Sequence, residues 1–268
     1  MHEFVSFNCK IVLARDVSIS ALSSSALYGN GVFSTIAIYN QQPFLWEKHW
    51  RRLESNAEKL KIDLAEFSES KTKNALAEII KKNDVSTGRA RITFFDESAS
   101  KIWPVESTQT ASLLITTGDM HPTSDNFRLT ISLYSVNSLS PLAGVKSCNY
   151  LEKFMTLDDA KSRGFDEALQ INERGEVTSA AMANVFWLTH GMLYTPSLKT
   201  GCLTGTTREF ILENLDYRES EATMDELHSA DAIFLTSAGL GVVQIAEFES
   251  RQFEKIEHPI LGLLPKRI

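Results

Sequence analysis

Cysteine is scarce in this chain of 268 residues, which contains only Cys9, Cys148 and Cys202. The three lie far apart, without the close pairs that zinc sites use, and an odd number cannot all pair with one another. The sequence therefore predicts neither a metal centre nor a disulfide framework. Free thiols are typical of a reducing compartment, so we expect a cytoplasmic protein.

The chain also lacks an apolar run long enough to span a membrane. Its first 14 residues alternate apolar and polar side chains, unlike the basic start and continuous apolar stretch of a signal peptide. No basic stretch is long enough to neutralise a phosphate backbone, and the net charge is −7. We therefore expect neither a membrane nor a nucleic acid as a partner.

What the chain does contain is ordinary globular composition, with 43% hydrophobic and 23% charged residues. The length suits two modest domains or one large one. Residues 118–125 form a polar stretch broken by glycine and proline, which is typical of a linker. We therefore predict an N-terminal α/β domain over residues 1–117 and a C-terminal domain over residues 126–268.

Side-chain periodicity predicts the elements of the first half. We expect a strand over residues 2–13 and a hairpin in which residues 40–43 turn residues 31–39 back into residues 44–46. Apolar residues at helical spacing predict an amphipathic helix through Trp50, Leu53, Ala57 and Leu60. A second helix over about 69–82 and strands at 89–95 and 111–117 complete this half.

The second half reads in the same way. We predict strands at 127–134 and 232–236, a helix over about 151–163, and a helix that Thr206 or Thr207 caps and that ends near Leu215. The sequences of residues 172–175 and 190–191 predict hairpin turns. These patterns alone indicate a soluble α/β protein with two domains.

Six segments carry a further pattern, and they are Tyr28–Phe33, His49–Leu53, Pro141–Tyr150, Gly164–Ala168, Asn184–Phe186 and Tyr194–Arg208. In this order they resemble the class IV pyridoxal-phosphate (PLP) enzymes, which include branched-chain and D-amino-acid aminotransferases and aminodeoxychorismate lyase. The resemblance implies a two-domain α/β (α+β) fold of type IV, whose C-terminal domain contains a curved, barrel-like sheet. It also implies PLP in the cleft between the domains, and a homodimer.

By this resemblance Lys146 is the catalytic residue, the lysine that joins PLP as a Schiff base. Such a lysine forms an imine with the cofactor's aldehyde and shuttles protons once substrate displaces it. A lysine is ordinarily a solvated surface residue. Here the mostly apolar segment Pro141–Val145 precedes it and Asn149-Tyr150 follows it, which favours the cofactor role.

The resemblance also assigns Arg52, Thr206 and Thr207 to the cofactor's phosphate. A guanidinium binds phosphate through two parallel hydrogen bonds. Without the resemblance, a charge on a helix surface would be the favoured interpretation of Arg52. The two threonines stand where a loop enters a helix, and such helix starts present N–H groups to an anion. Plain helix capping would use the same backbone groups.

Three further positions match only the branched-chain branch of the family or its substrate pocket. Tyr150 aligns with a tyrosine near the phenolic oxygen of the cofactor, and Arg91 with an arginine that binds the substrate's carboxylate. Phe33 falls at a substrate-binding position. A tyrosine packed beside the helix start and a strand arginine that points to solvent are the simpler alternatives.

Four positions depart from the family pattern. Ser34 stands where many members carry an acidic residue, and Ala238 replaces a threonine of the second phosphate loop. Asp96-Glu97 replaces an Arg-Gly, which removes support for D-amino-acid aminotransferase activity. The glutamate that faces the pyridine nitrogen in the family is replaced by Ser179.

Aminodeoxychorismate lyase, which converts 4-amino-4-deoxychorismate to 4-aminobenzoate and pyruvate for folate, is the activity that these features favour. The chain is short like that branch, the segments from Asn184 to Gly201 resemble it, and Ser34 matches its small hydroxyl residue. An aminotransferase of branched-chain or other α-amino acids is the alternative, which Tyr150 and Arg91 favour. A PLP-binding relative without catalysis is the third reading. In each case we expect a small-molecule amine as the ligand.

Overall fold

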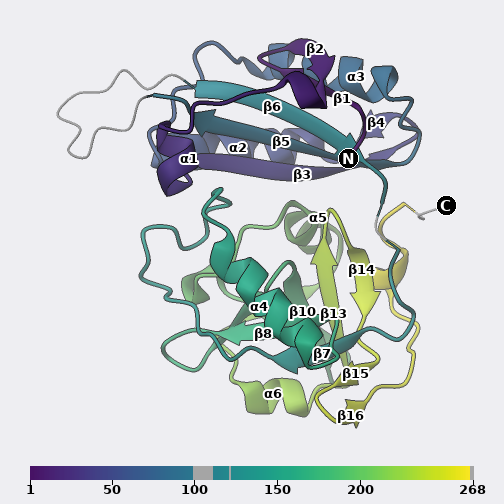
Figure 1. Ribbon diagram of the computed structural model, residues 1–268. Coiled ribbons are helices and arrows are strands. Elements are labelled where there is room, and N and C mark those ends of the chain that lie inside the picture. The colour runs from purple at the N-terminus through teal and green to yellow at the C-terminus, as the bar shows by residue number, and fades with distance from the viewer. Residues whose placement is uncertain (99–110, 121, 266–268) are drawn as a thin grey trace. The chain divides into compact units, whose positions relative to one another are not determined.

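The computed structural model describes residues 1–98, 111–120 and 122–265 (Figure 1). The chain forms two compact units. The first comprises the described residues of Met1–Met120 together with Lys146–Asn149, and the second those of His121–Val145 and Tyr150–Lys266. Within the predicted linker, Gly118 is the last residue of a strand and His121 lies outside the described residues. The predicted domain boundaries stay a prediction.

The first unit contains a six-stranded antiparallel sheet in the order β2-β1-β6-β5-β3-β4. The strands are β1 (Phe4–Phe7), β2 (Lys10–Leu13), β3 (Gly31–Tyr39), β4 (Gln42–Pro43), β5 (Gly88–Asp96) and β6 (Ala111–Gly118). Strand β3 pairs with β5 along its whole inner edge, and its opposite edge carries only β4 at the far end. The rest of that edge matters for the site described below.

Two predictions about this sheet were wrong. The single strand expected over residues 2–13 is two strands, because Asn8 and Cys9 adopt left-handed φ angles of 49° and 62° that turn the chain. The return strand expected over residues 44–46 is instead the two-residue β4. Trp46 begins a helix, where its indole is 2% exposed, so burial at helical spacing prevailed over local strand propensity.

The helices of the first unit are α1 (Ser24–Tyr28), α2 (Trp46–Lys59) and α3 (Glu69–Lys82), with a 3-10 turn at Ala14–Asp16. Helix α2 packs against β3 through its predicted apolar stripe, in which the Trp50 ring meets Phe94 of β5 edge-on at 6.2 Å between centroids. The indole N–H of Trp46 donates to Glu69 at 2.8 Å and ties α2 to α3. The two amphipathic helices were therefore predicted correctly.

The second unit contains two five-stranded sheets, in the orders β12-β11-β10-β13-β14 and β16-β15-β7-β8-β9. The strands are β7 (Arg128–Ile131), β8 (Glu167–Ile171), β9 (Val177–Ala180), β10 (Asn184–Thr189), β11 (Met192–Pro196), β12 (Tyr217–Ser220), β13 (Ala232–Ser237), β14 (Gly241–Gln244), β15 (Glu247–Phe248) and β16 (Arg251–Gln252). The helices are α4 (Leu151–Ser162), α5 (Thr206–Asn214) and α6 (Met224–His228), with 3-10 turns at Leu198–Thr200 and Pro259–Gly262.

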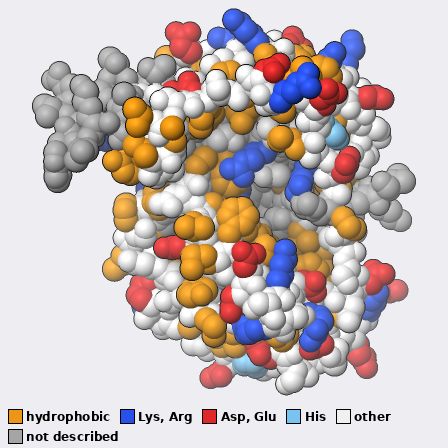
Figure 2. Space-filling model, in the orientation of Figure 1, with side chains coloured by type: hydrophobic (Ala, Val, Ile, Leu, Met, Phe, Trp, Pro, Cys, Tyr) orange, Lys and Arg blue, Asp and Glu red, His pale blue; other side chains and the backbone are white. Residues whose placement is uncertain are grey.

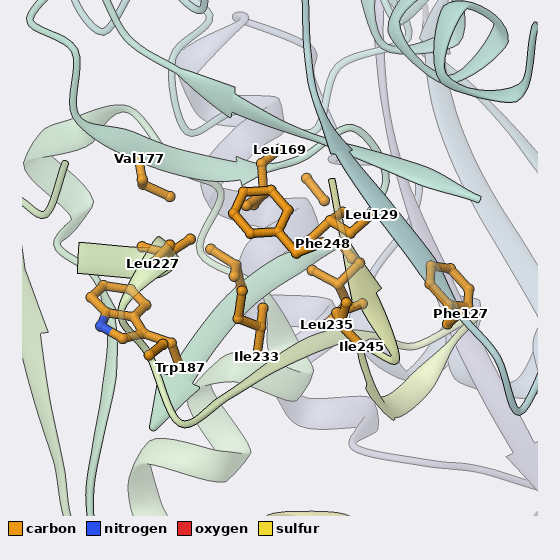
Figure 3. Packing of buried hydrophobic residues seen from close by; sticks show 14 of the residues in the cluster. Phe127, Leu129, Leu169, Val177, Trp187, Leu227, Ile233, Leu235, Ile245 and Phe248 are labelled. Carbon is orange, nitrogen blue, oxygen red and sulfur yellow. The ribbon is translucent and has the colours of Figure 1, made fainter. Parts of the chain in front are cut away.

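One apolar core joins these two sheets. Leu129 and Leu169 from one sheet pack with Trp187, Ile233 and Leu235 from the other, and all five are at most 1% exposed (Figure 3). The mixed α/β fold class is therefore confirmed. In the described residues the curved, barrel-like region consists of two sheets around a shared core, without a ladder that closes them into a ring.

The hairpin turn that was predicted at residues 190–191 is confirmed. The β10–β11 hairpin turns at His190 and Gly191, whose φ angles of 50° and 75° suit a two-residue hairpin turn.

Among the described helices, none is long and apolar enough to cross a membrane. Acidic and basic side chains are interspersed over the face drawn in Figure 2, as befits a chain with a small net negative charge.

Candidate active site

Lys146 lies beside the open edge of strand β3 in the first unit. Its carbonyl oxygen accepts a hydrogen bond from the N–H of Phe33 at 3.0 Å, and the next residue, Ser147, forms an antiparallel bridge with Val32. These are sheet-like contacts, and they fix the backbone of the lysine. Lys146–Asn149 accordingly belongs to the first unit, although the chain on either side of it belongs to the second.

Gly31 makes this close approach possible. The N–H of Cys148 donates to the carbonyl oxygen of Gly31 at 2.7 Å. A Cβ atom at Gly31 would lie 2.9 Å from the carbonyl oxygen of Phe94 and 3.0 Å from the Cys148 sulfur. A larger residue would have to displace the segment that carries Lys146, so the glycine is required by space rather than by an unusual φ.

The side chains of Lys146 and Arg91 both lie over the ring of Phe33. The distances to the ring centroid are 4.6 Å from Lys146 Nζ and 3.5 Å from the guanidinium carbon of Arg91. Thr35 is paired with Arg91, and Phe33 with Thr93, so Phe33 and Arg91 project from the same face of the sheet. Two cations thus gather on one aromatic ring, an arrangement that suits an anionic group.

Arg52 is held by a polar chain on the other side of β3. Its Nη2 donates to the Ser34 hydroxyl at 2.7 Å, and the same hydroxyl lies 2.7 Å from Nδ1 of His49. The donor in the contact between this hydroxyl and His49 Nδ1 depends on which ring nitrogen of His49 carries the proton. His49 and Arg52 stand three residues apart on α2 and therefore on one helix face.

His49 is an uncharged member of this chain. Its side chain is 1% exposed, and burial holds its pKa well below the usual range, with the positive charges of Arg52 and Lys146 acting in the same direction. The segment His49–Leu53 was recognised in the sequence by its family motif. The hydrogen bonds that join His49, Ser34 and Arg52 became visible only in the structure.

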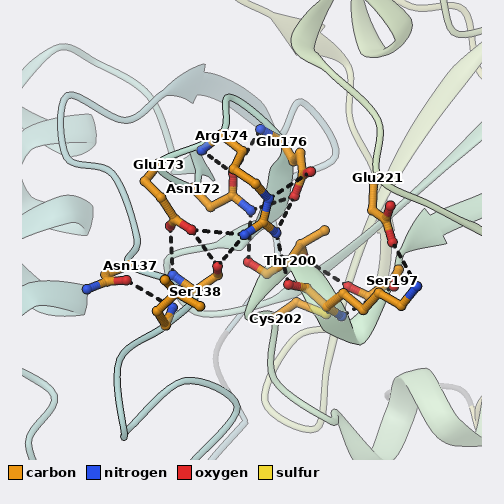
Figure 4. A network of polar contacts seen from close by, with 12 residues as sticks. Asn137, Ser138, Asn172, Glu173, Arg174, Glu176, Ser197, Thr200, Cys202 and Glu221 are labelled. Carbon is orange, nitrogen blue, oxygen red and sulfur yellow. Dashed lines mark hydrogen bonds and ion pairs between the residues drawn. The ribbon is translucent and has the colours of Figure 1, made fainter.

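The segment that leads to Lys146 is anchored within the second unit by a polar network (Figure 4). The backbone N–H and hydroxyl of Ser138 donate to the Glu173 carboxylate at 2.8 and 2.6 Å. The guanidinium of Arg174 donates to the Ser138 hydroxyl at 2.8 Å and pairs with Glu176 at 2.6 Å. The β8–β9 hairpin therefore fixes the start of the lysine-bearing loop.

The start of α5 carries Thr206 and Thr207, both buried. The N-cap is Gly205, whose position supplies no side chain to accept from the first N–H groups of the helix. A Cβ atom there would lie 1.9 Å from Oδ1 of Asn184. The Nδ2 group of Asn184 donates to the Leu203 carbonyl oxygen at 2.8 Å and holds this side chain in place. This packing excludes the usual Ser, Thr or Asp cap and keeps the helix start suited to an anion.

Tyr150 stands at the N-cap of α4 and does not cap it with its side chain. Its half-buried ring meets Phe154 edge-on, with centroids 6.0 Å apart. Packing at the helix start is therefore real, and it is compatible with an additional contact of the phenol to a cofactor.

Ser179 lies on β9, where it is 7% exposed and directly opposite Gln170 of β8. The carboxamide oxygen of Gln170 accepts a hydrogen bond from Nζ of Lys153 on α4. Sequence reasoning did not single out Lys153, because nothing in its spacing distinguishes it from Lys161 on the same helix. Its hydrogen bond to Gln170, which pairs with Ser179, places Lys153 on the face of the sheet that carries Ser179.

The predicted site residues thus fall into two groups. Phe33, Arg52, Arg91 and Lys146 lie in the first unit, where the contacts above link them through Phe33 and Ser34. The second unit holds Tyr150, Ser179, Thr206 and Thr207. Among the residues that the structure describes, no cluster of His, Cys, Asp or Glu side chains could hold a metal ion.

Comparison with known proteins identifies the class. The model of the class IV amino-transferase family matches residues 31–248, so the chain belongs to that family, and the resemblance in its motifs is confirmed. Members of this family are enzymes that depend on pyridoxal phosphate.

The relatives of this chain differ from one another in activity. The chain is 27% identical to aminodeoxychorismate lyase of Bacillus subtilis, over 90% of this chain and 85% of that protein. It is 26% identical to D-alanine aminotransferase of Bacillus licheniformis, over 92% of this chain and 89% of that protein. A solved branched-chain aminotransferase of Thermoproteus uzoniensis has the same fold, with a TM-score of 0.89, 24% identity and coverage of 97% and 91%.

Proposed function

We propose that this enzyme is a PLP-dependent lyase that converts 4-amino-4-deoxychorismate to 4-aminobenzoate and pyruvate, a step of folate biosynthesis. The likeness to the lyase of Bacillus subtilis supports this proposal. We further propose that it acts in the cytoplasm as a homodimer, on the grounds of its scattered free thiols and of its family.

The residues present fit the cofactor by the chemistry of their donors. Arg52 offers a guanidinium and α5 offers the N–H groups at Thr206 and Thr207, and each of these is a group that binds phosphate. Tyr150 offers a phenol for the cofactor's ring oxygen. When bound, PLP supplies an aldehyde that takes the substrate's amine and a ring that accepts electrons.

The choice of a lyase rests on one observation, which is that position 179 is a serine where the family has a glutamate. A carboxylate facing the pyridine nitrogen would favour its protonated form and deepen the electron sink that transamination requires. Ser179 and its neighbour Gln170 bring a hydroxyl and a carboxamide to this face of β8 and β9. Such a weak sink suits an elimination, because the electrons leave promptly with the departing group.

Lys146 performs the proton transfers in this proposal. Its amine removes the proton from the amine-bearing carbon of the substrate, and the bond to the neighbouring enolpyruvyl oxygen breaks as the ring becomes aromatic. Lys146 or a bound water then returns a proton to the methylene carbon of the departing enolpyruvyl group, which leaves as pyruvate. The reaction is balanced without an oxidant or a second substrate.

Arg91 and Phe33 are the proposed substrate contacts. The guanidinium of Arg91 stacks on Phe33 beside Lys146, where it would hold a carboxylate of the substrate. The same arrangement favours the alternative function, an aminotransferase for branched-chain or other α-amino acids, because every such substrate carries a carboxylate next to its reacting carbon.

The test supplies the purified holoenzyme with 4-amino-4-deoxychorismate and measures 4-aminobenzoate by fluorescence and pyruvate with a coupled dehydrogenase. The proposal requires one pyruvate for each 4-aminobenzoate. A parallel reaction contains 2-oxoglutarate and single amino acids, and glutamate formed there without 4-aminobenzoate in the first reaction would establish the aminotransferase. Absence of turnover in both would leave a PLP-binding relative without catalysis.

A further inference from the structure

Lys153 is a partly buried lysine that the reaction above does not use. It stands in the first turn of α4, and its Nζ donates to Oε1 of Gln170, whose Nε2 in turn donates to Thr156 at 3.2 Å. Burial lowers the pKa of the Lys153 amine, while the nearby carboxylates of Glu167 and Glu152 act in the opposite direction. Burial of a lysine amine costs free energy unless a partner group compensates its charge or accepts its hydrogen bonds.

The surroundings of Lys153 contain little negative charge that is not already engaged in other contacts. Glu167 turns its carboxylate to the backbone N–H groups of Ala168, Ala181 and Met182, at 2.9 to 3.1 Å. Burial raises the pKa of Glu167 to about 7 even so. Glu167 is therefore a structural group that closes the turn after β9, and its charge is shared among these N–H groups.

The position of Lys153 is defined by the pairing of two strands. Gln170 and Ser179 are directly opposite in the antiparallel β8–β9 pair, so their side chains leave the same face of the sheet about 5 Å apart at Cβ. The Lys153 amine is bonded to the end of the Gln170 side chain. Lys153 thus brings N–H donors to the face that carries Ser179, and the Gln170 bond uses one of the three.

We propose that Lys153 and Ser179 together present N–H and O–H donors to the pyridine nitrogen of the bound cofactor and hold that nitrogen unprotonated. The inference rests on the proposed role of PLP in this chain and on the alignment of Ser179 with the family's pyridine-facing position. It adds Lys153 as a cofactor-binding residue, because both the ammonium and the neutral amine can donate to the lone pair of the nitrogen. A positive charge at this place also disfavours a second proton on the ring.

This pairing accounts for both unusual residues at once. A serine alone offers the single lone pair of the ring nitrogen only an uncharged donor, and a lysine alone in this place has its charge only partly compensated. Side by side, the two favour a neutral pyridine ring that accepts hydrogen bonds. The enzyme would then hold its cofactor with the electron demand that an elimination needs and a transamination lacks.

The experiment measures the ring nitrogen directly, without any turnover. The apoenzyme is loaded with PLP that carries ¹⁵N in the pyridine ring, and the ¹⁵N shift of the complex is recorded from pH 6 to about pH 9. An unprotonated pyridine and a pyridinium have well-separated shifts. The proposal requires the unprotonated shift in the wild-type protein across this range, and a pyridinium shift at neutral pH would overturn it.

Four variants assign the effect to residues. Ser179→Glu alone should shift the nitrogen only partly towards pyridinium, because the new carboxylate also pairs with Lys153, whereas Ser179→Glu with Lys153→Met should shift it fully. Lys153→Met alone should make the shift depend on pH, and Lys161→Met, on the exposed side of α4, should leave it unchanged. Equal behaviour of the Lys153 and Lys161 variants would remove Lys153 from the site.

The same samples separate this inference from the proposed function. PLP binding is read from the visible absorption band, and the products 4-aminobenzoate and pyruvate are read from the separate reaction. If no PLP binds, both proposals fail. If PLP binds and the nitrogen is protonated, only the inference fails, whereas an unprotonated nitrogen with transaminase products overturns the lyase and leaves the role of Lys153 standing.

Discussion

Ser34 and His49 are joined by a buried hydrogen bond of 2.7 Å, and through it the fold holds Arg52 in place. Loss of the Ser34 hydroxyl removes one acceptor from the guanidinium of Arg52 and one hydrogen-bond partner from the imidazole of His49. A hydrogen bond of this kind contributes about 0.5–1.5 kcal/mol. We therefore expect Ser34→Ala to weaken PLP binding by roughly two- to tenfold, measured by titrating apoenzyme with PLP. Ser86→Ala, at an exposed serine, is the matched control and should bind normally.

Lys146→Ala should abolish the visible absorption band of the bound cofactor and all turnover, while the circular dichroism spectrum stays that of the wild type. Borohydride reduction of the wild-type holoenzyme followed by peptide mass spectrometry should locate the phosphopyridoxyl label on Lys146. Lys153 serves as the internal comparison, because it is the other partly buried lysine discussed above. A label on Lys153, together with retained activity of the alanine variant, would refute the assignment of Lys146.

Arg52→Ala should weaken PLP binding more than it reduces turnover at saturating cofactor. A charge-assisted contact to phosphate contributes roughly 1.5–3 kcal/mol, so the dissociation constant should rise about tenfold or more. Thr207→Ala should act in the same direction. Arg51→Ala, at the exposed neighbouring residue on α2, is the control. Unchanged affinity in the Arg52 variant would return this residue to the role of a helix-surface charge.

Glu167 should give the stability of the protein a characteristic dependence on pH. Its pKa rises from the ordinary value of 4.5 to about 7 on folding, so between these values the folded state binds more protons at this group than the unfolded state. Its contribution to the free energy of unfolding therefore falls as pH increases from about 4.5 to 7, by about 3 kcal/mol at most.

Urea unfolding of the wild type and of Glu167→Gln at pH 5, 6 and 7 tests this sign. The variant lacks the titration, so its stability relative to the wild type should improve steadily as pH rises. The amide also sets an N–H₂ group against one of the backbone donors, which lowers stability by a constant amount at every pH. A constant difference between the two proteins over this range would show that Glu167 does not titrate there.

Sequence patterns sufficed where structure depends on neighbours in the chain. The stripe through Trp50 and Leu53 predicted α2, and the polar pair His190-Gly191 predicted a hairpin turn. The two-residue strands β15 and β16 are too short to display a period, and they exist because β15 pairs with β7 far away in the chain.

The candidate site likewise has a part that could be predicted from local sequence and a part that could not. Lys146 and Arg52 were recognisable from motifs, since each stands in a segment with a family pattern. The contact of Arg52 with Ser34 spans 18 residues and depends on how α2 packs on β3. The approach of Lys153 to the face of Ser179 requires two separate events, the pairing of β8 with β9 and the packing of α4 on β8. The turn at residues 172–175 predicts the pairing of β8 with β9, but the packing of α4 on β8 leaves no local signal in the sequence.

The short segment Lys146–Asn149 has a consequence for dividing this protein into fragments. A fragment that ends at Gly118 would contain Arg52 and Arg91, yet it would lack the segment that pairs with β3 at Val32 and Phe33. It would expose an unpaired strand edge, which promotes aggregation. A fragment that begins after the linker would carry Lys146 on a loop without its sheet. The two compact units therefore do not correspond to two separable stretches of the chain, because the segment with the proposed cofactor lysine lies within the second stretch and pairs with a strand of the first.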